Sequence, residues 1–146
     1  MRRALYTAEV TARGGRSGHV RSADGILDID LRIPREMGGA GEPGSNPEQL
    51  FAAAYAACFE STLRAIARHQ KKLLHETSIT ARVTLGLTDD RRYQLGVELR
   101  GHLEGVAPED ALALMRAAHD VCPYSNATRG NVDVRLLIDS DLAAVA

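Results

Sequence analysis

The chain has 146 residues, of which 45% are hydrophobic and 25% are charged, and its formal net charge is −1 at pH 7. This is the composition of a soluble globular protein, and we expect residues 1–146 to form a single domain. The charge provides no basic field for nucleic acid or for an anionic membrane. We find no apolar stretch suited to a signal peptide or a spanning helix, so we expect a cytoplasmic protein with neither nucleic acid nor membrane as partner.

Alternating apolar and polar residues predict three strands in the first part of the chain, at residues 5–12, 19–22 and 26–33. Gly14 and Gly15 end the first of these strands, and Asp24-Gly25 is a two-residue turn signal before the third. A glycine-rich loop follows.

The next segment has the signals of a helix start. Asn46 can cap the helix and Pro47 suits its first position, while Ser45 with Glu48 is the alternative capping register. We expect this helix to extend toward Lys72.

The second half of the chain predicts two long strands, a helix and a last strand. The strands cover residues 78–87 and 93–103, and a helix that starts at Pro108 ends before Pro123. One face of that helix is apolar, with Ala111, Leu114, Met115, Ala118 and Cys122. A short helical turn over 125–129 and a strand over 132–138 complete the order βββ-α-ββ-α-β, which is typical of an α+β fold.

The chain has two cysteines, Cys58 and Cys122, and both lie on apolar helical stripes that should face the same core. Their spacing matches neither a C-x-x-C motif nor a zinc ribbon. Buried cysteines often act only as small hydrophobic residues. In a reducing cytosol, however, a disulfide is more often catalytic or sensory than structural. The residues alone leave a redox couple and two inert thiols as alternatives.

A reactive Cys58 needs a nearby cation, because burial raises the pKa of a thiol. Arg16 lies among glycines and is a candidate, although a surface arginine in a turn is the alternative. Glu48 is a second candidate, with helix capping as its alternative role. On one straight helix Glu48 and Cys58 would be about 15 Å apart. Either the helix starts later, or the carboxylate comes from a second subunit, and the alanine-rich segment 50–57 would suit a dimer interface.

Other motifs are weaker. Residues 39–44 match G-x-G-x-x-G, but no βαβ unit surrounds them, so nucleotide binding is not expected. The histidines show no spacing for a metal site, so we predict neither a metal nor another cofactor.

The chain resembles the organic hydroperoxide resistance proteins, a branch of the OsmC-like family. The resemblance runs nearly end to end, and the segment around Cys122 is its most specific part. Ser17 stands where an aspartate is common, and Ala54 where a glycine is common. The segments that carry the resemblance are residues 5–8, 14–16, 38–41, 46–51, 55–59 and 118–131.

The resemblance implies an OsmC-like fold in an intertwined homodimer, with central helices wrapped by sheets. It also implies a thiol peroxidase that reduces organic hydroperoxides to alcohols and defends against oxidative stress. Cys58 would attack the peroxide and become a sulfenic acid, and Cys122 would resolve it as a disulfide. Arg16 would stabilise the Cys58 thiolate, and Glu48 would hold Arg16 in place.

The resemblance further implies a preference for alkyl and lipid hydroperoxides. An apolar lining gives a physical reason, because alkyl groups gain by burial. The lining would come from Phe51, Tyr55, Phe59 and Met115. Electrons would come from dihydrolipoamide or a lipoylated protein. Three alternatives stay open: a redox sensor, a dimeric binding module with inert thiols, and an OsmC-type relative with a different substrate range.

Overall fold

The computed structural model describes residues 3–139, and its element order confirms the expected α+β fold. The strands are β1 (Val10–Arg13), β2 (His19–Ser22), β3 (Asp28–Asp30), β4 (Thr77–Leu87), β5 (Tyr93–Leu103) and β6 (Asp133–Ile138). The helices are α1 (Pro47–His69), α2 (Pro108–Val121) and α3 (Pro123–Thr128). By internal contacts the chain divides into two compact units, Met1–Leu50 and Phe51–Ala146, each of which is described by itself below.

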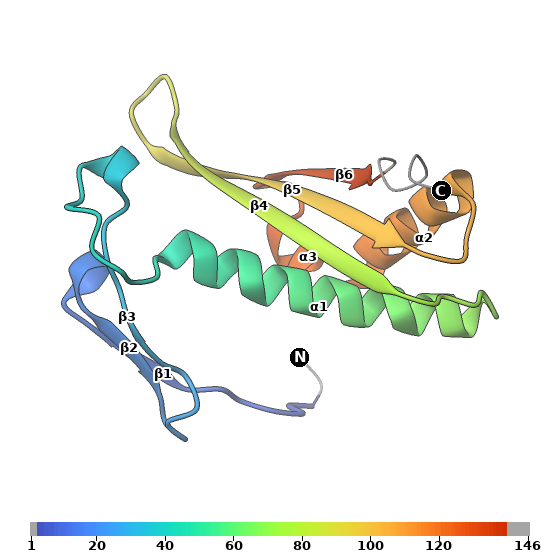
Figure 1. Ribbon diagram of the computed structural model, residues 1–146, viewed down its shortest axis with the longest axis horizontal. Coiled ribbons are helices and arrows are strands. Elements are labelled where there is room, and N and C mark those ends of the chain that lie inside the picture. The colour runs from blue at the N-terminus through green and yellow to red at the C-terminus, as the bar shows by residue number, and fades with distance from the viewer. Residues whose placement is uncertain (1–2, 140–146) are drawn as a thin grey trace. The chain divides into compact units, whose positions relative to one another are not determined.

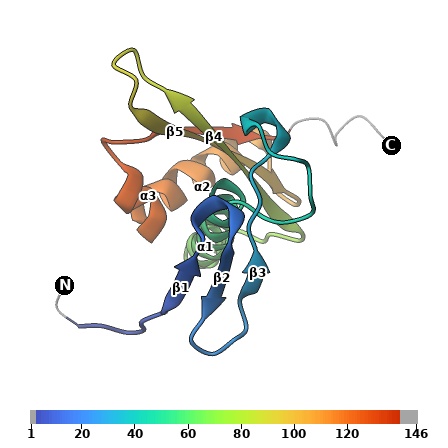
Figure 2. The same ribbon diagram turned by 90° about the vertical axis from the view of Figure 1, so that its left-hand side faces the viewer.

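The first unit contains an antiparallel sheet in the order β1-β2-β3 (Figure 2). The prediction of a strand over 5–12 is wrong for residues 5–9, since β1 starts only at Val10. β2 explains the difference, because it offers β1 just four residues to pair with. The strand expected over 26–33 is likewise reduced to the three residues of β3.

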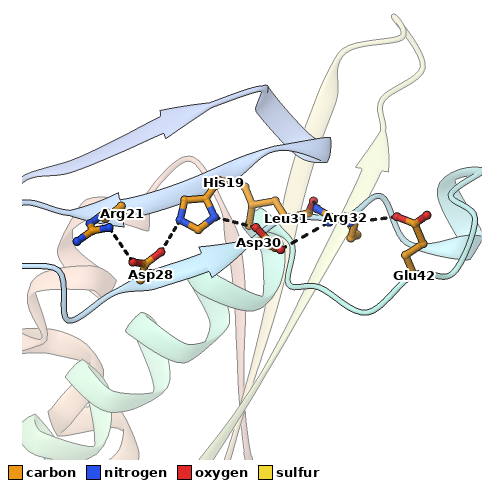
Figure 3. A network of polar contacts seen from close by, with 7 residues as sticks. All are labelled: His19, Arg21, Asp28, Asp30, Leu31, Arg32 and Glu42. Atoms are coloured by element: carbon orange, nitrogen blue, oxygen red, sulfur yellow. Dashed lines mark hydrogen bonds and ion pairs between the residues drawn. The ribbon is translucent and has the colours of Figure 1, made fainter.

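A network of ion pairs runs along one face of β2 and β3 (Figure 3). The ring of His19 lies between two carboxylates, with Nδ1 2.8 Å from Asp30 Oδ1 and Nε2 2.5 Å from Asp28 Oδ1. Arg21 pairs with Asp28, and Arg32 pairs with Asp30. Hydrogen bonds to Asp30 and then to Asp28 raise the pKa of His19, so this surface favours the imidazolium form.

The start of α1 follows the first capping register proposed above. The Asn46 side chain accepts a hydrogen bond from the Gln49 backbone N–H at 2.9 Å, and the helix begins at Pro47. The Gln49 side chain does not close a capping box, because it accepts a hydrogen bond from the Ser45 hydroxyl instead. The helix ends at His69, slightly before the expected Lys72.

The second unit contains a sheet in the order β4-β5-β6, with β4 antiparallel and β6 parallel to β5. Parallel neighbours need a long crossover connection, and α2 and α3 supply it. Figures 1 and 2 show the helices of this unit on one side of the sheet. The connection that carries Cys122 therefore runs across the face on which α1 also packs.

The core of the second unit lies between that sheet face and the helices. The inward residues of the strands form three rows, Ile79–Gly101–Ile138, Ala81–Leu99–Leu136 and Val83–Val97–Val134. Gly101 leaves room for α2, because a Cβ at this position would lie 2.8 Å from the Met115 sulfur. The close approach places α2 directly against the sheet.

Within residues 3–139, α1 is the one helix that is long and apolar enough to cross a membrane by length and composition. The core helix of a globular protein passes the same test. α1 is such a helix on one side, where Tyr55, Phe59, Leu63 and Ala67 are buried. Small residues, including Ala53, Ala57, Ser61 and Ala65, remain exposed on the other side.

Candidate active site

The structure brings Cys58 and Cys122 together as free thiols whose sulfur atoms are 3.8 Å apart. Cys58 lies in α1 and is half-buried, whereas Cys122 is fully buried. A disulfide needs a sulfur–sulfur distance of about 2.05 Å, so the two thiols could bond after a small movement. The arrangement can therefore act as a dithiol–disulfide couple.

Cys122 is placed by the break between α2 and α3. Pro123 cannot continue α2, because it lacks a backbone N–H and disfavours helical geometry in the residue before it. Cys122 accordingly has an extended backbone, with φ −60° and ψ 129°. It ends α2 through a hydrogen bond from its N–H to the Ala118 carbonyl and also precedes the first residue of α3. The Cys-Pro pair thus fixes the position of the thiol at a corner of the chain.

The surroundings of Cys58 mostly oppose its ionisation. Burial has the largest effect and raises the pKa of the Cys58 thiol, and the neighbouring Cys122 thiol raises it further. A hydrogen bond from the Tyr124 backbone N–H acts in the opposite direction and lowers that pKa. Within its own unit Cys58 favours the thiol form, so a nucleophilic role requires an additional cation.

Arg16 and Glu48 form a bidentate ion pair. Arg16 Nη1 donates to Glu48 Oε2 at 2.8 Å, and Nη2 donates to Glu48 Oε1 at 2.6 Å. The Arg16 hydrogen bonds hold the pKa of the Glu48 carboxyl below its ordinary value. Gly14 and Gly15 allow the tight turn before Arg16, since both have left-handed φ values that other residues rarely adopt.

The position of Glu48 tests one of the two alternatives proposed from the sequence. The reading in which the helix starts later is wrong, because Glu48 lies in the first turn of α1. The carboxylate therefore lies at the N-terminal end of the helix, where negative charge is favourable, and there contacts the Arg16 guanidinium.

The four expected pocket residues differ in burial. Phe51 is partly buried, whereas Tyr55, Phe59 and Met115 are wholly buried in the core of the second unit. Phe51 and Tyr55 meet edge to face, with ring centroids 6.0 Å apart. Phe51 is thus the most accessible of the four, and the other three are core residues.

Sequence reasoning missed a set of polar residues beside Cys122. The Tyr55 hydroxyl lies 2.9 Å from Ser125 Oγ and 3.2 Å from Thr128 Oγ1. His119 Nδ1 lies 2.9 Å from the same Ser125 Oγ. One signal was available, because Ser125 and Thr128 are spaced three apart and so share a face of a short helix.

The comparisons with known proteins cover nearly the whole chain. The model of the family described as OsmC-like protein matches residues 35–137. The chain belongs to the OsmC-like family. An organic hydroperoxide resistance protein of Xanthomonas axonopodis pv. citri (strain 306) is 50% identical over 135 residues, which are 92% of this chain and 94% of that protein.

Solved structures of the OsmC-like family share this fold. The crystal structure of an organic hydroperoxide resistance protein from Legionella pneumophila is 52% identical, has a TM-score of 0.89 and covers 94% of this chain and 99% of its own. That of OhrB from Bacillus subtilis is 47% identical, has a TM-score of 0.87 and covers 93% and 100%. Both the expected resemblance and the OsmC-like fold are confirmed.

Proposed function

We propose that the protein is a cysteine-based peroxidase that reduces organic hydroperoxides to alcohols and protects the cell against oxidative stress. The observation that carries the proposal is the contact between two thiols 3.8 Å apart in a chain of the OsmC-like family. The relatives named organic hydroperoxide resistance proteins support the substrate class.

In the first step the Cys58 thiolate attacks the distal oxygen of the hydroperoxide. A sulfur–oxygen bond forms, the oxygen–oxygen bond breaks, and the alkoxide leaves as the alcohol after taking a proton. Cys58 becomes a sulfenic acid. The greater exposure of Cys58 favours it over the fully buried Cys122 for this role.

In the second step Cys122 attacks the sulfenic sulfur of Cys58. A disulfide forms, the sulfur–oxygen bond breaks, and the hydroxide leaves as water with the proton from Cys122. The short distance between the thiols supports this step, because the two sulfur atoms need to approach by less than 2 Å.

Arg16 supplies the positive charge that the Cys58 thiolate requires, and Glu48 orients Arg16. The bidentate contact supports the second role, because it fixes the plane of the guanidinium. A carboxylate beside a lone thiolate would oppose ionisation, so Glu48 acts through Arg16.

The active form in this proposal is an intertwined homodimer. The exposed small residues of α1 support it, because Ala53, Ala57 and Ala65 would let a second helix approach closely. Phe51, Tyr55, Phe59 and Met115 form the apolar side of the substrate pocket and favour alkyl and lipid hydroperoxides.

The reductant in this proposal is dihydrolipoamide or a lipoylated protein, which attacks the disulfide and returns both cysteines to thiols. The support is the membership of this chain in the family, together with the general ability of a dithiol to reduce a disulfide by exchange. The compartment would be the cytoplasm, where such disulfides are transient.

The test follows consumption of tert-butyl hydroperoxide by the purified protein with dihydrolipoamide, beside the Cys58→Ser and Cys122→Ser variants. We expect sustained turnover in the wild type and none in Cys58→Ser. Cys122→Ser should consume only about one or two equivalents of peroxide and then stop, as Cys58 becomes a sulfenic and then a sulfinic acid. Glutathione in place of dihydrolipoamide tests the choice of donor. Wild-type protein that leaves the peroxide intact, with Cys58 still a thiol, would refute the proposal in favour of a binding module.

A further inference from the structure

Three hydroxyl groups are buried together beside the thiol pair. Tyr55 and Ser125 are fully buried, and Thr128 is 5% exposed. Burying a hydroxyl among apolar side chains costs free energy unless it is hydrogen-bonded, and these three satisfy one another. The cluster has a defined structure and is not a random polar inclusion in the core.

The cluster joins the same two elements that carry the thiols. Tyr55 precedes Cys58 by one turn of α1, and Ser125 follows Cys122 by three residues, in α3. The hydrogen bond between the Tyr55 and Ser125 side chains therefore spans the junction at which the sulfur atoms meet. The backbone N–H of Tyr124 bonds to the Cys58 thiol at the same junction.

α3 is also tied to α2 on its other side. His119 in α2 lies 2.9 Å from Ser125 Oγ, and the Arg129 guanidinium donates to the His119 carbonyl at 2.8 Å. Burial and the charge of Arg129 lower the pKa of His119, which favours the neutral ring, whose Nδ1 can accept a hydrogen bond from the Ser125 hydroxyl. The hydroxyls can then be ordered, with Tyr55 donating to Ser125 and Ser125 to His119.

We propose that Tyr55 and Ser125 are positioning residues for disulfide closure, and that their hydrogen bond holds Cys122 within attack distance of oxidised Cys58. The inference rests on the proposed peroxidase function. It concerns the step in which the bond between the two sulfurs forms, the sulfur–oxygen bond of the sulfenic acid breaks and water leaves. Of the two cysteines, only Cys58 forms or breaks a bond in the preceding attack on peroxide.

The hydrogen bond between Tyr55 and Ser125 affects which product the sulfenic acid forms. A Cys58 sulfenic acid that is not captured by Cys122 can react with a second peroxide and become a sulfinic acid. A loosened α3 would slow the capture and leave the second oxidation unchanged. The partition between disulfide and sulfinic acid therefore reports the position of Cys122.

The test uses Tyr55→Phe, which removes one hydroxyl and keeps the ring in the core. Ser125 and Thr128 retain His119 and the Tyr124 carbonyl as partners, so the variant should fold. Single-turnover stopped-flow experiments with tert-butyl hydroperoxide resolve the rate of disulfide closure separately from the rate of sulfenic acid formation. Disulfide closure should be about fivefold slower, the effect of one lost hydrogen bond. Mass spectrometry at excess peroxide should show a larger sulfinic fraction.

Tyr93→Phe is the matched control, because Tyr93 is 75% exposed at the start of β5. Ser125→Ala should slow closure as Tyr55→Phe does, and the double variant should be no slower than the single variants. A merely structural role would lower the melting temperature and leave the sulfinic fraction unchanged.

Two outcomes separate this inference from the function on which it rests. If the wild type turns over and Tyr55→Phe closes its disulfide at the wild-type rate, the positioning role is refuted and the peroxidase stands. If the wild type forms no sulfenic acid, the peroxidase itself is refuted, and this inference with it.

Discussion

At the residue scale, the local environment of Cys58 opposes the chemistry proposed for it. Burial and the Cys122 thiol raise its pKa, and the single N–H of Tyr124 acts against them. A thiol in such a place is inert unless a cation offsets the burial. In the proposed mechanism, the positive charge of Arg16 must therefore offset the effects that raise the Cys58 pKa.

Arg16→Ala should slow alkylation of Cys58 by iodoacetamide at pH 7 by about tenfold or more, because a nearby positive charge stabilises a thiolate to that extent. The measurement is the rate of Cys58 modification in the Cys122→Ser background, followed by mass spectrometry. Arg13→Ala is the control, since Arg13 is exposed in β1. Equal rates in the wild type and Arg16→Ala would show that the thiolate is stabilised by another group.

The cysteines could be chosen from the sequence because they are scarce and lie on apolar stripes. The cluster of buried hydroxyls around Tyr55 could not be predicted in this way. Tyr55 and Ser125 are 70 positions apart, and a tyrosine in an alanine-rich helix has the pattern of an ordinary core residue. Such a contact depends on how α3 is placed, and hydrophobic periodicity carries no information on that.

At the element scale, the sequence predicted the long strands and β2 better than it predicted β1 and β3. β5 has the predicted bounds, because it is the central strand and has a partner on each side along much of its length. β1 and β3 are shorter than expected, because alternation of residue types extends beyond the partner strand that would hold it in a sheet. The alternation of apolar and polar residues shows that a segment can form a strand, and the length of the neighbouring strand limits how much of it does.

The β2–β3 pair makes a measurable prediction through His19. Its folded-state pKa is raised by Asp30 and Asp28, so it should titrate above the ordinary value of about 6.5 in an NMR pH titration. The raised pKa means that these ion pairs stabilise the folded chain fully below that value and lose their effect as the pH rises through the folded-state pKa.

Asp30→Asn is the control for this titration, since it removes the carboxylate with the larger effect. The pKa of His19 should then be lower than in the wild type but should keep the contribution of Asp28. A His19 signal that titrates at the ordinary value in both proteins would show that the network does not persist in solution.

At the scale of the whole molecule, α1 has one buried face and one exposed face. One face fills the core of the second unit, and the other leaves small residues exposed along the helix. The alanine-rich segment 50–57 contributes residues to both faces. A single chain covers only part of the helix, and the sequence cannot state which surface covers the rest.

Ala57→Arg should convert the proposed homodimer into a monomer, because it places a charge and a long side chain on the exposed small-residue face of α1. Size-exclusion chromatography with light scattering measures the change in mass. Thr84→Arg, on the exposed side of β4, should leave the mass unchanged. A wild-type protein with the mass of one chain would contradict the homodimer.

The sequence distance between the two cysteines has a thermodynamic consequence. They are 64 positions apart, so their bond would close a ring that contains the β4–β5 hairpin and α2. On the chain-entropy model such a ring stabilises the folded state by about 4 kcal/mol. The disulfide form should therefore melt at a clearly higher temperature than the dithiol form in differential scanning calorimetry. The Cys122→Ser variant cannot form this disulfide, so oxidant should not raise its melting temperature. Oxidation by peroxide would then raise the free energy of unfolding of the protein that consumes the peroxide, and the reductant would lower it again.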